Sequence, residues 1–142
     1  MSLIAEAEVP EDDYNLFTFV GGPNSGKTTL ACLFPGETFY INAPGEKIPR
    51  DFPKGKKPKS LPKKMGAVDS YKKLMQVLSS ILRDEHNFKN LVIDAITTYD
   101  IIFTEEVLAE SGAKNLATAY DGYGAGYETV AAKHGAVKKA CD

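Results

Sequence analysis

The sequence predicts an α/β fold with a parallel sheet. Three segments that favour strands each precede a segment that favours a helix. A glycine-rich turn separates the first strand from the first helix. The chain has 142 residues, which is enough for one domain.

Composition excludes several protein classes. The chain is 43% hydrophobic and 25% charged, with a formal net charge of -2, as expected of an ordinary globular protein. Its apolar runs fall short of the roughly 20 residues that a membrane span needs, so we expect a cytoplasmic protein without a membrane partner. Cys32 and Cys141 have no partner pattern for a disulfide framework or a structural zinc site.

The N-terminal half begins with an acidic segment, residues 1–13, which we expect to be a flexible tail. Residues 14–142 then form the predicted domain. Tyr14 to Val20 favours a strand, and Lys27 to Phe34 permits a helix that Pro35-Gly36 ends. A second short strand is predicted from Thr38 to Asn42.

Residues 44–67 are predicted to form a long, basic loop that is rich in proline and lysine. Eight basic residues and one acidic residue lie between Lys47 and Lys64, a local charge of +7 in a chain whose other residues sum to -9. This charge fits a solvated surface loop, and it fits contact with the backbone of single-stranded DNA as well.

The C-terminal half continues the alternation of predicted helices and strands. Apolar residues at helical spacing predict a helix from about Tyr71 to His86, followed by a buried strand from Leu91 to Asp94. Further helices are expected from about Tyr99 to Glu110 and from Glu128 to Lys139, with a Gly-Tyr loop between them.

The turn after the first strand matches the phosphate-binding loop pattern in full. The candidate nucleotide-binding residues are Gly21, Gly22, Pro23, Asn24, Ser25, Gly26, Lys27, Thr28 and Thr29. Such a loop directs backbone N–H groups toward phosphates, while its lysine reaches the β and γ oxygens and its hydroxyl ligates Mg²⁺. The predicted cofactors are therefore ATP and Mg²⁺.

Asp94 is the second candidate metal ligand. It ends an apolar strand, a position from which a carboxylate can hold the magnesium shell opposite Thr28. Any buried strand can end in an acid, so the prediction depends on the loop upstream.

Four segments carry a resemblance to a known family: GGPNSGKTT at 21–29, YINAPGE at 40–46, LVIDAITT at 91–98 and DGYGAGY at 121–127. Together they resemble the RecA-like P-loop ATPases, and most closely the phage-encoded branch associated with DNA recombination and single-strand annealing. The resemblance implies a three-layer α/β/α P-loop NTPase fold and a role in DNA metabolism, in the host cytoplasm if the protein is phage-encoded.

Two departures from the RecA-like pattern matter. The second strand of that family usually ends Asp-x-Glu, where the glutamate activates water, whereas this chain has Asn42-Ala43-Pro44. Glu46 is then the candidate catalytic base beside Lys27, and we expect weak or absent hydrolysis. The chain also ends before a fourth strand, so we expect an incomplete sheet. Either the sheet self-associates or takes a partner's strand, or the chain is part of a longer protein.

Other functions stay open at this stage. A non-catalytic nucleotide-binding module fits the same motif, and in a P-loop small-molecule kinase the basic loop would act as a lid. A small GTPase is disfavoured because the residues after Asp94 do not form DxxG and no NKxD occurs.

Overall fold

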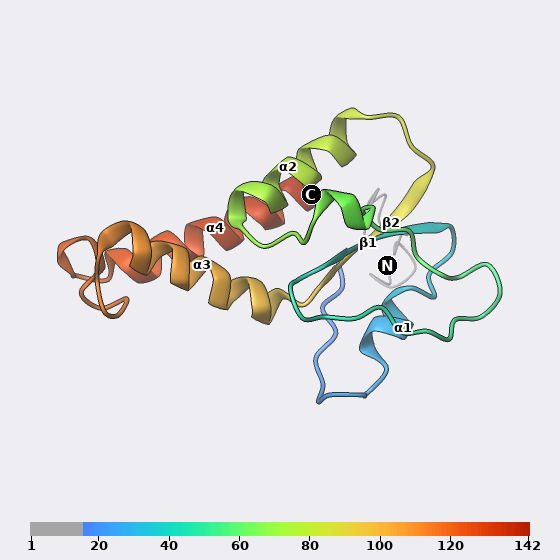
Figure 1. Cartoon of the computed structure of the whole chain (residues 1–142), viewed down its shortest axis with the longest axis horizontal. Helices are drawn as coiled ribbons and strands as arrows, with labels where there is room; N and C mark the ends of the chain where they lie inside the picture. Colours follow the sequence, from blue (N-terminus) through green and yellow to red (C-terminus); the bar gives the residue numbers. More distant parts are fainter. Residues whose placement is uncertain (1–15) are drawn as a thin grey trace, which may run out of the picture.

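Two parallel strands and three long helices are the main elements of residues 16–142, the part of the chain that this computed structural model describes (Figure 1). The long helices are α2 (Tyr71–Arg83), α3 (Ile96–Ser111) and α4 (Ala125–Cys141). A short helix, α1 (Lys27–Ala31), follows the glycine-rich turn, and 3₁₀ turns lie at Lys63–Met65 and Ala119–Asp121. The predicted acidic tail lies outside the described residues.

The sheet consists of β1 (Glu37–Asn42) and β2 (Phe88–Asp94). They run parallel, and in their register Tyr40 lies beside Val92 and Asn42 lies beside Asp94. Helix α2 lies in the connection between them, as parallel strands require a crossover. The carboxyl ends of both strands therefore meet at one edge, and the residues that follow them lie close together.

The core lies on one face of this sheet. Phe39 and Ile41 point to this face and join buried residues of α2, α3 and α4. Tyr40, between them in the sequence, is fully buried on the opposite face because successive strand side chains alternate. Both faces of β1 are thus covered, which explains four consecutive buried residues in a short strand.

Aromatic contacts join the three long helices. Phe103 of α3 is fully buried, with its ring 5.4 Å from that of Tyr71 on α2 and 4.9 Å from that of His134 on α4. Figure 1 shows α3 and α4 side by side as a hairpin that extends away from the sheet. Helix α2 begins with a capping bond from the backbone N–H of Lys73 to Ser70 Oγ, 3.2 Å long.

The predicted strand from Tyr14 to Val20 is wrong over residues 16–20, which have no strand pairing. Phe17 and Phe19 instead pack their rings against Phe34, at 5.2 and 6.4 Å. A strand needs a neighbour for its backbone hydrogen bonds, and here β2 pairs only with β1 within residues 16–142. The coarser prediction, a mixed α/β fold with a parallel sheet compatible with a P-loop NTPase, is confirmed.

Several element boundaries also differ from the sequence prediction. Helix α1 ends at Ala31, where the N–H of Cys32 is shared between two carbonyls, rather than at Phe34. Helix α3 begins directly after Ala95, and α4 begins at Ala125, so part of the expected Gly-Tyr loop is helical. Gly126 permits this because a Cβ there would lie 2.3 Å from the carbonyl oxygen of Leu116.

The long basic segment, residues 44–67, is irregular apart from one 3₁₀ turn and one isolated bridge at Lys59. It is attached to β1 through Lys59, whose N–H donates to Thr38 O at 2.9 Å and whose carbonyl accepts from Tyr40 N–H at 2.7 Å. Lys59 thus covers the outer edge of β1, while the far edge of β2 pairs with no strand in residues 16–142. A partner or second copy on that edge stays a prediction.

No helix in the described part of the chain is both long enough and apolar enough to span a membrane.

Candidate functional site

The glycine-rich turn forms an open loop in front of α1. Gly26 adopts φ +82° immediately before the helix, a left-handed conformation that favours glycine. The Lys27 ammonium lies over the loop and donates to the carbonyls of Gly21 and Gly22, at 2.6 and 2.7 Å. Ser25 Oγ lies 3.3 Å from the same nitrogen. The lysine that the motif assigns to phosphates is therefore held at the loop by three oxygens.

The structure brings Thr28 and Asp94 together across 66 residues of sequence. The Thr28 hydroxyl donates to Asp94 Oδ2 at 2.5 Å. Asp94 reaches this position because it ends β2 at the edge of the sheet that faces α1. Both side chains are partly buried, so the two predicted metal ligands form one polar cluster at the end of the loop.

Tyr40 is the member of this cluster that the sequence analysis missed. Its hydroxyl donates to the same Asp94 oxygen at 2.8 Å. Burial raises the pKa of Tyr40 well above its usual range, and the hydrogen bond to Asp94 and that carboxylate's charge add to the shift. Tyr40 therefore stays neutral and acts as a donor that orients the carboxylate. The sequence held one signal for this role. Tyr40 lies two residues before Asn42, the last residue of β1, so both side chains lie on the same face of the strand.

Replacing Tyr40 with Phe is expected to lower the free energy of unfolding by about 1–2 kcal/mol at pH 7, because Asp94 loses a buried donor. A raised tyrosine pKa stabilises the folded state below the unfolded pKa of about 10, and this contribution is lost as pH rises through the folded pKa. The difference from the parent should therefore shrink above about pH 10. Urea denaturation at several pH values measures it. Tyr123→Phe, at a fully exposed hydroxyl, is the control and should change nothing.

Glu46 lies after the turn that ends β1. Its carboxylate accepts a hydrogen bond from Thr98 Oγ1 of α3 at 3.3 Å, and its backbone carbonyl lies 3.5 Å from Asn42 Nδ2. Its charge is one of the smaller causes of the raised Tyr40 pKa, so it lies within electrostatic reach of the cluster. The structure thus places Glu46 on the Asp94 side of the sheet, tied to the first turn of α3.

The residues present suit a magnesium nucleotide. Hydroxyl and carboxylate oxygens are the ligands that Mg²⁺ prefers, and this ion commonly takes one or two carboxylates together with substrate phosphates. A Cβ built on Gly22 or Gly26 would meet nothing within 4 Å, so space is open beside the loop. No group of three or more His, Cys, Asp or Glu side chains in residues 16–142 forms a metal centre by itself.

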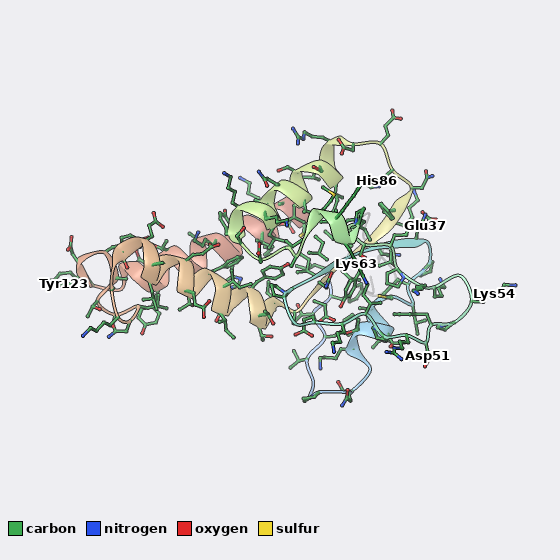
Figure 2. The ribbon with its side chains drawn as sticks, viewed as in Figure 1. Glu37, Asp51, Lys54, Lys63, His86 and Tyr123 are labelled. Carbon is green, nitrogen blue, oxygen red and sulfur yellow. The ribbon has the colours of Figure 1, made fainter. Side chains whose placement is uncertain are left out.

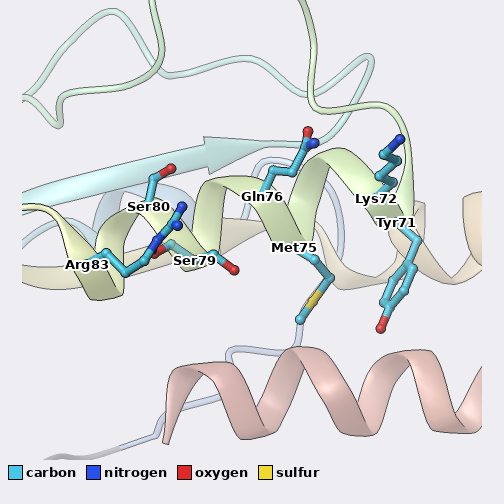
Figure 3. Close-up of a pocket in the computed structure, with 7 residues that line it drawn as sticks. All are labelled: Tyr71, Lys72, Met75, Gln76, Ser79, Ser80 and Arg83. Atoms are coloured by element: carbon cyan, nitrogen blue, oxygen red, sulfur yellow. The ribbon is translucent and has the colours of Figure 1, made fainter.

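An open groove lies elsewhere, along α2, with a volume of about 840 Å³. Its lining residues include Tyr71, Met75 and Arg83 (Figure 3). Every lining residue belongs to α2, and none is a predicted site residue. The groove therefore adds nothing to the nucleotide site.

The loop at 21–28 and the aspartate at the end of a parallel strand define a P-loop nucleotide-binding domain. The model of one family, described as an AAA domain, matches residues 14–140, and the chain belongs to that family. Proteins of this class are P-loop ATPases that generally bind ATP with Mg²⁺. Neither a curated protein nor a solved structure matches the chain.

Proposed function

We propose that the chain binds ATP or ADP with Mg²⁺ through residues 21–29 and Asp94. The observation that carries this proposal is the hydrogen bond between Thr28 and Asp94, which joins the phosphate-binding loop to the end of β2. Lys27 would turn from the loop carbonyls to the β and γ phosphate oxygens, while Thr28 and Asp94 would hold the metal. Membership of the AAA domain family supports the same cofactors.

Lys27→Ala is expected to weaken ATP binding at least about tenfold, which is roughly 1.4 kcal/mol. The variant loses the charge that meets the phosphates and keeps a short side chain compatible with α1. Calorimetric titration with ATP and Mg²⁺ measures the affinity, and circular dichroism checks the fold. Lys72→Ala removes an equal charge from the exposed face of α2 and should bind like the parent. Equal affinity of Lys27→Ala and the parent would refute the proposal.

The biological role that we propose is in phage DNA recombination or replication, with hydrolysis weak or absent in this chain alone. It is supported by the resemblance of four segments to the phage-encoded RecA-like ATPases and by the absence of a glutamate directly after β1. A non-catalytic nucleotide-binding module is the alternative, and measured turnover separates the two.

We also propose that the basic segment, residues 47–64, contacts the backbone of single-stranded nucleic acid. Its local charge of +7 and the exposure of Lys54, Lys57 and Lys59 support this contact. The attachment of Lys59 to β1 keeps the segment beside the sheet, so a bound strand would lie close to the nucleotide-binding domain.

Replacing Lys54, Lys56, Lys57 and Lys59 with Ala is expected to weaken single-strand binding and to reduce its salt dependence. Each phosphate contact that is lost lowers the slope of log affinity against log salt by about 0.7. Fluorescence anisotropy over a range of salt concentrations measures this slope. The control is a variant with four exposed lysines outside the segment changed to Ala: Lys72, Lys89, Lys138 and Lys139. If both variants behave alike, only net charge matters and the segment is a solvated loop.

A further inference from the structure

The two oxygens of the Asp94 carboxylate have different surroundings. Thr28 Oγ1 and Tyr40 Oη both donate to Oδ2, at 2.5 and 2.8 Å, and no group of residues 16–142 donates to Oδ1. The one buried side-chain polar atom without a partner in this part of the chain is Thr38 Oγ1. Asp94 Oδ1 also lacks a partner, so it must be accessible to solvent. The carboxylate therefore has one oxygen that is occupied and one that is open.

The two donors to Oδ2 come from different elements. Thr28 lies on α1, a helix of five residues in which no residue is buried, directly after the phosphate-binding loop. Tyr40 lies on β1, the strand that pairs with β2 and thus with Asp94. Tyr40 is fully buried, so packing fixes its ring and the position of its hydroxyl. Tyr40 is therefore the donor that the protein interior holds in place.

The two hydroxyls differ in what they can do for a metal. A hydroxyl donates one hydrogen bond and keeps lone pairs, so Thr28 can donate to Asp94 and ligate Mg²⁺ at the same time. The carboxylate needs a defined orientation as well. The terminal torsion of an aspartate is broad and nearly two-fold, so rotation would exchange Oδ1 and Oδ2. Hydrogen bonds to Oδ2 oppose this rotation and keep Oδ1 open.

We propose that Tyr40 is a positioning residue for the metal: by holding Asp94 Oδ2, it keeps Oδ1 available to Mg²⁺ or to a water of the ion's hydration shell. This role rests on the nucleotide site proposed above, and Tyr40 performs it through Asp94 alone. Hydrogen-bond partners of metal ligands typically contribute about 10- to 100-fold to metal affinity, because they orient the ligand before the ion arrives. The buried hydroxyl of Tyr40 thus sets how strongly nucleotide binding depends on Mg²⁺.

The test measures ATP affinity of the full chain by calorimetry, once in excess Mg²⁺ and once in EDTA. The ratio of the two affinities reports the coupling between metal and nucleotide. Tyr40→Phe keeps the ring and removes only the hydroxyl. We expect the ratio to fall about tenfold, while the affinity in EDTA stays within about twofold of the parent. An unchanged ratio, or an equal loss of affinity in Mg²⁺ and in EDTA, would overturn the proposal.

Tyr99→Phe is the matched control. Tyr99 is also a fully buried tyrosine, but its hydroxyl donates to the carbonyl of Val68, at 3.0 Å, rather than to Asp94. The control variant loses a buried hydrogen bond of the same kind, so it should be destabilised about as much as Tyr40→Phe. Its Mg²⁺ dependence should match that of the parent. Equal changes of the ratio in the two variants would show that the effect comes from lost stability and would overturn the proposal.

A double substitution tests whether Tyr40 acts through Asp94. Asp94→Asn removes the charge that holds the metal, so the ratio should fall toward one. Adding Tyr40→Phe to that variant should change the ratio by less than about twofold, because the two residues act as one unit. A further fall as large as the one that Tyr40→Phe causes in the parent would overturn the proposed route.

A second measurement needs no substitution and remains informative if Tyr40→Phe folds poorly. In the parent labelled with ¹³C-tyrosine, the Cζ signal of Tyr40 should shift when Mg²⁺ is added to the ATP complex, because its acceptor gains a metal. Figure 2 shows Tyr123 at the far end of the α3–α4 hairpin, so its signal is the reference and should not shift. No shift at Tyr40 would overturn the proposal. A parent that binds no ATP in either buffer would refute the proposed function, and this role with it, whereas ATP binding without the effects at Tyr40 would refute this role alone.

Discussion

Purified chain is expected to turn over ATP far more slowly than the common enzyme rate of about 1 per second, even though it binds the nucleotide. The strand β1 ends at Asn42 and is followed by Ala43 and Pro44, so no carboxylate stands where the RecA-like ATPases that the sequence resembles place the residue that activates water. Loss of such a residue typically lowers the rate 10²- to 10⁴-fold. Glu46 is the first carboxylate that follows the strand in the sequence. Its side chain accepts a hydrogen bond from Thr98, which holds it near the start of α3.

Glu46→Gln tests whether this carboxylate supports the remaining turnover. The variant keeps the side chain's shape and its capacity to accept from Thr98, so nucleotide affinity should be unchanged while turnover falls at least a further 10²-fold. Steady-state phosphate release, with and without single-stranded DNA, measures the rate. Glu105→Gln changes an exposed glutamate of α3 and should leave the rate unaltered. A kcat of about 1 per second or more for the chain alone would contradict slow hydrolysis.

Phe103→Ala is expected to destabilise the domain by about 3–5 kcal/mol. The Phe103 ring is fully buried and contacts Tyr71, Tyr99 and His134, so its removal leaves a cavity at the point where α2, α3 and α4 meet. Whole domains have only about 5–15 kcal/mol of stability, so a large fraction of the total is lost.

Urea denaturation followed by circular dichroism measures the change. Ile101→Ala, two residues earlier on α3 at a position that is 59% exposed, is the matched control and should cost less than about 1 kcal/mol. A similar cost for both substitutions would show that Phe103 does not hold the helices together.

The phosphate-binding loop and the three long helices were predictable because their signals are local. The spacing from Gly21 to Thr28 defines the loop within eight residues, and apolar residues at helical spacing define α2 without reference to the rest of the chain. Asp94 was predicted as a metal ligand from its place at a strand end, and the structure sets it beside Thr28.

The predicted strand at 14–20 failed, over its described residues 16–20, for the opposite reason. Its aromatic and β-branched residues favour an extended chain, but a strand also needs a neighbour with free backbone groups, and no local pattern specifies one. In residues 16–20 the aromatic rings of Phe17 and Phe19 pack against the ring of Phe34 instead. The start of α4 differs from the prediction for a related reason. Gly126 packs closely against the backbone of Leu116, a contact between separate segments, and α4 begins at Ala125 although glycines usually indicate a loop.

By itself the sequence determined the class of domain, the position of the P-loop motif and the position of a basic segment, because each depends on residues that are near one another along the chain. Only the tertiary structure decided which distant groups meet. The register that sets Asn42 beside Asp94 brings the hydroxyl of Tyr40 to that carboxylate, and the pairing of Lys59 with β1 attaches the basic segment to the sheet. Strand register and loop docking come from contacts between segments 20 to 66 residues apart, and the local sequence encodes neither.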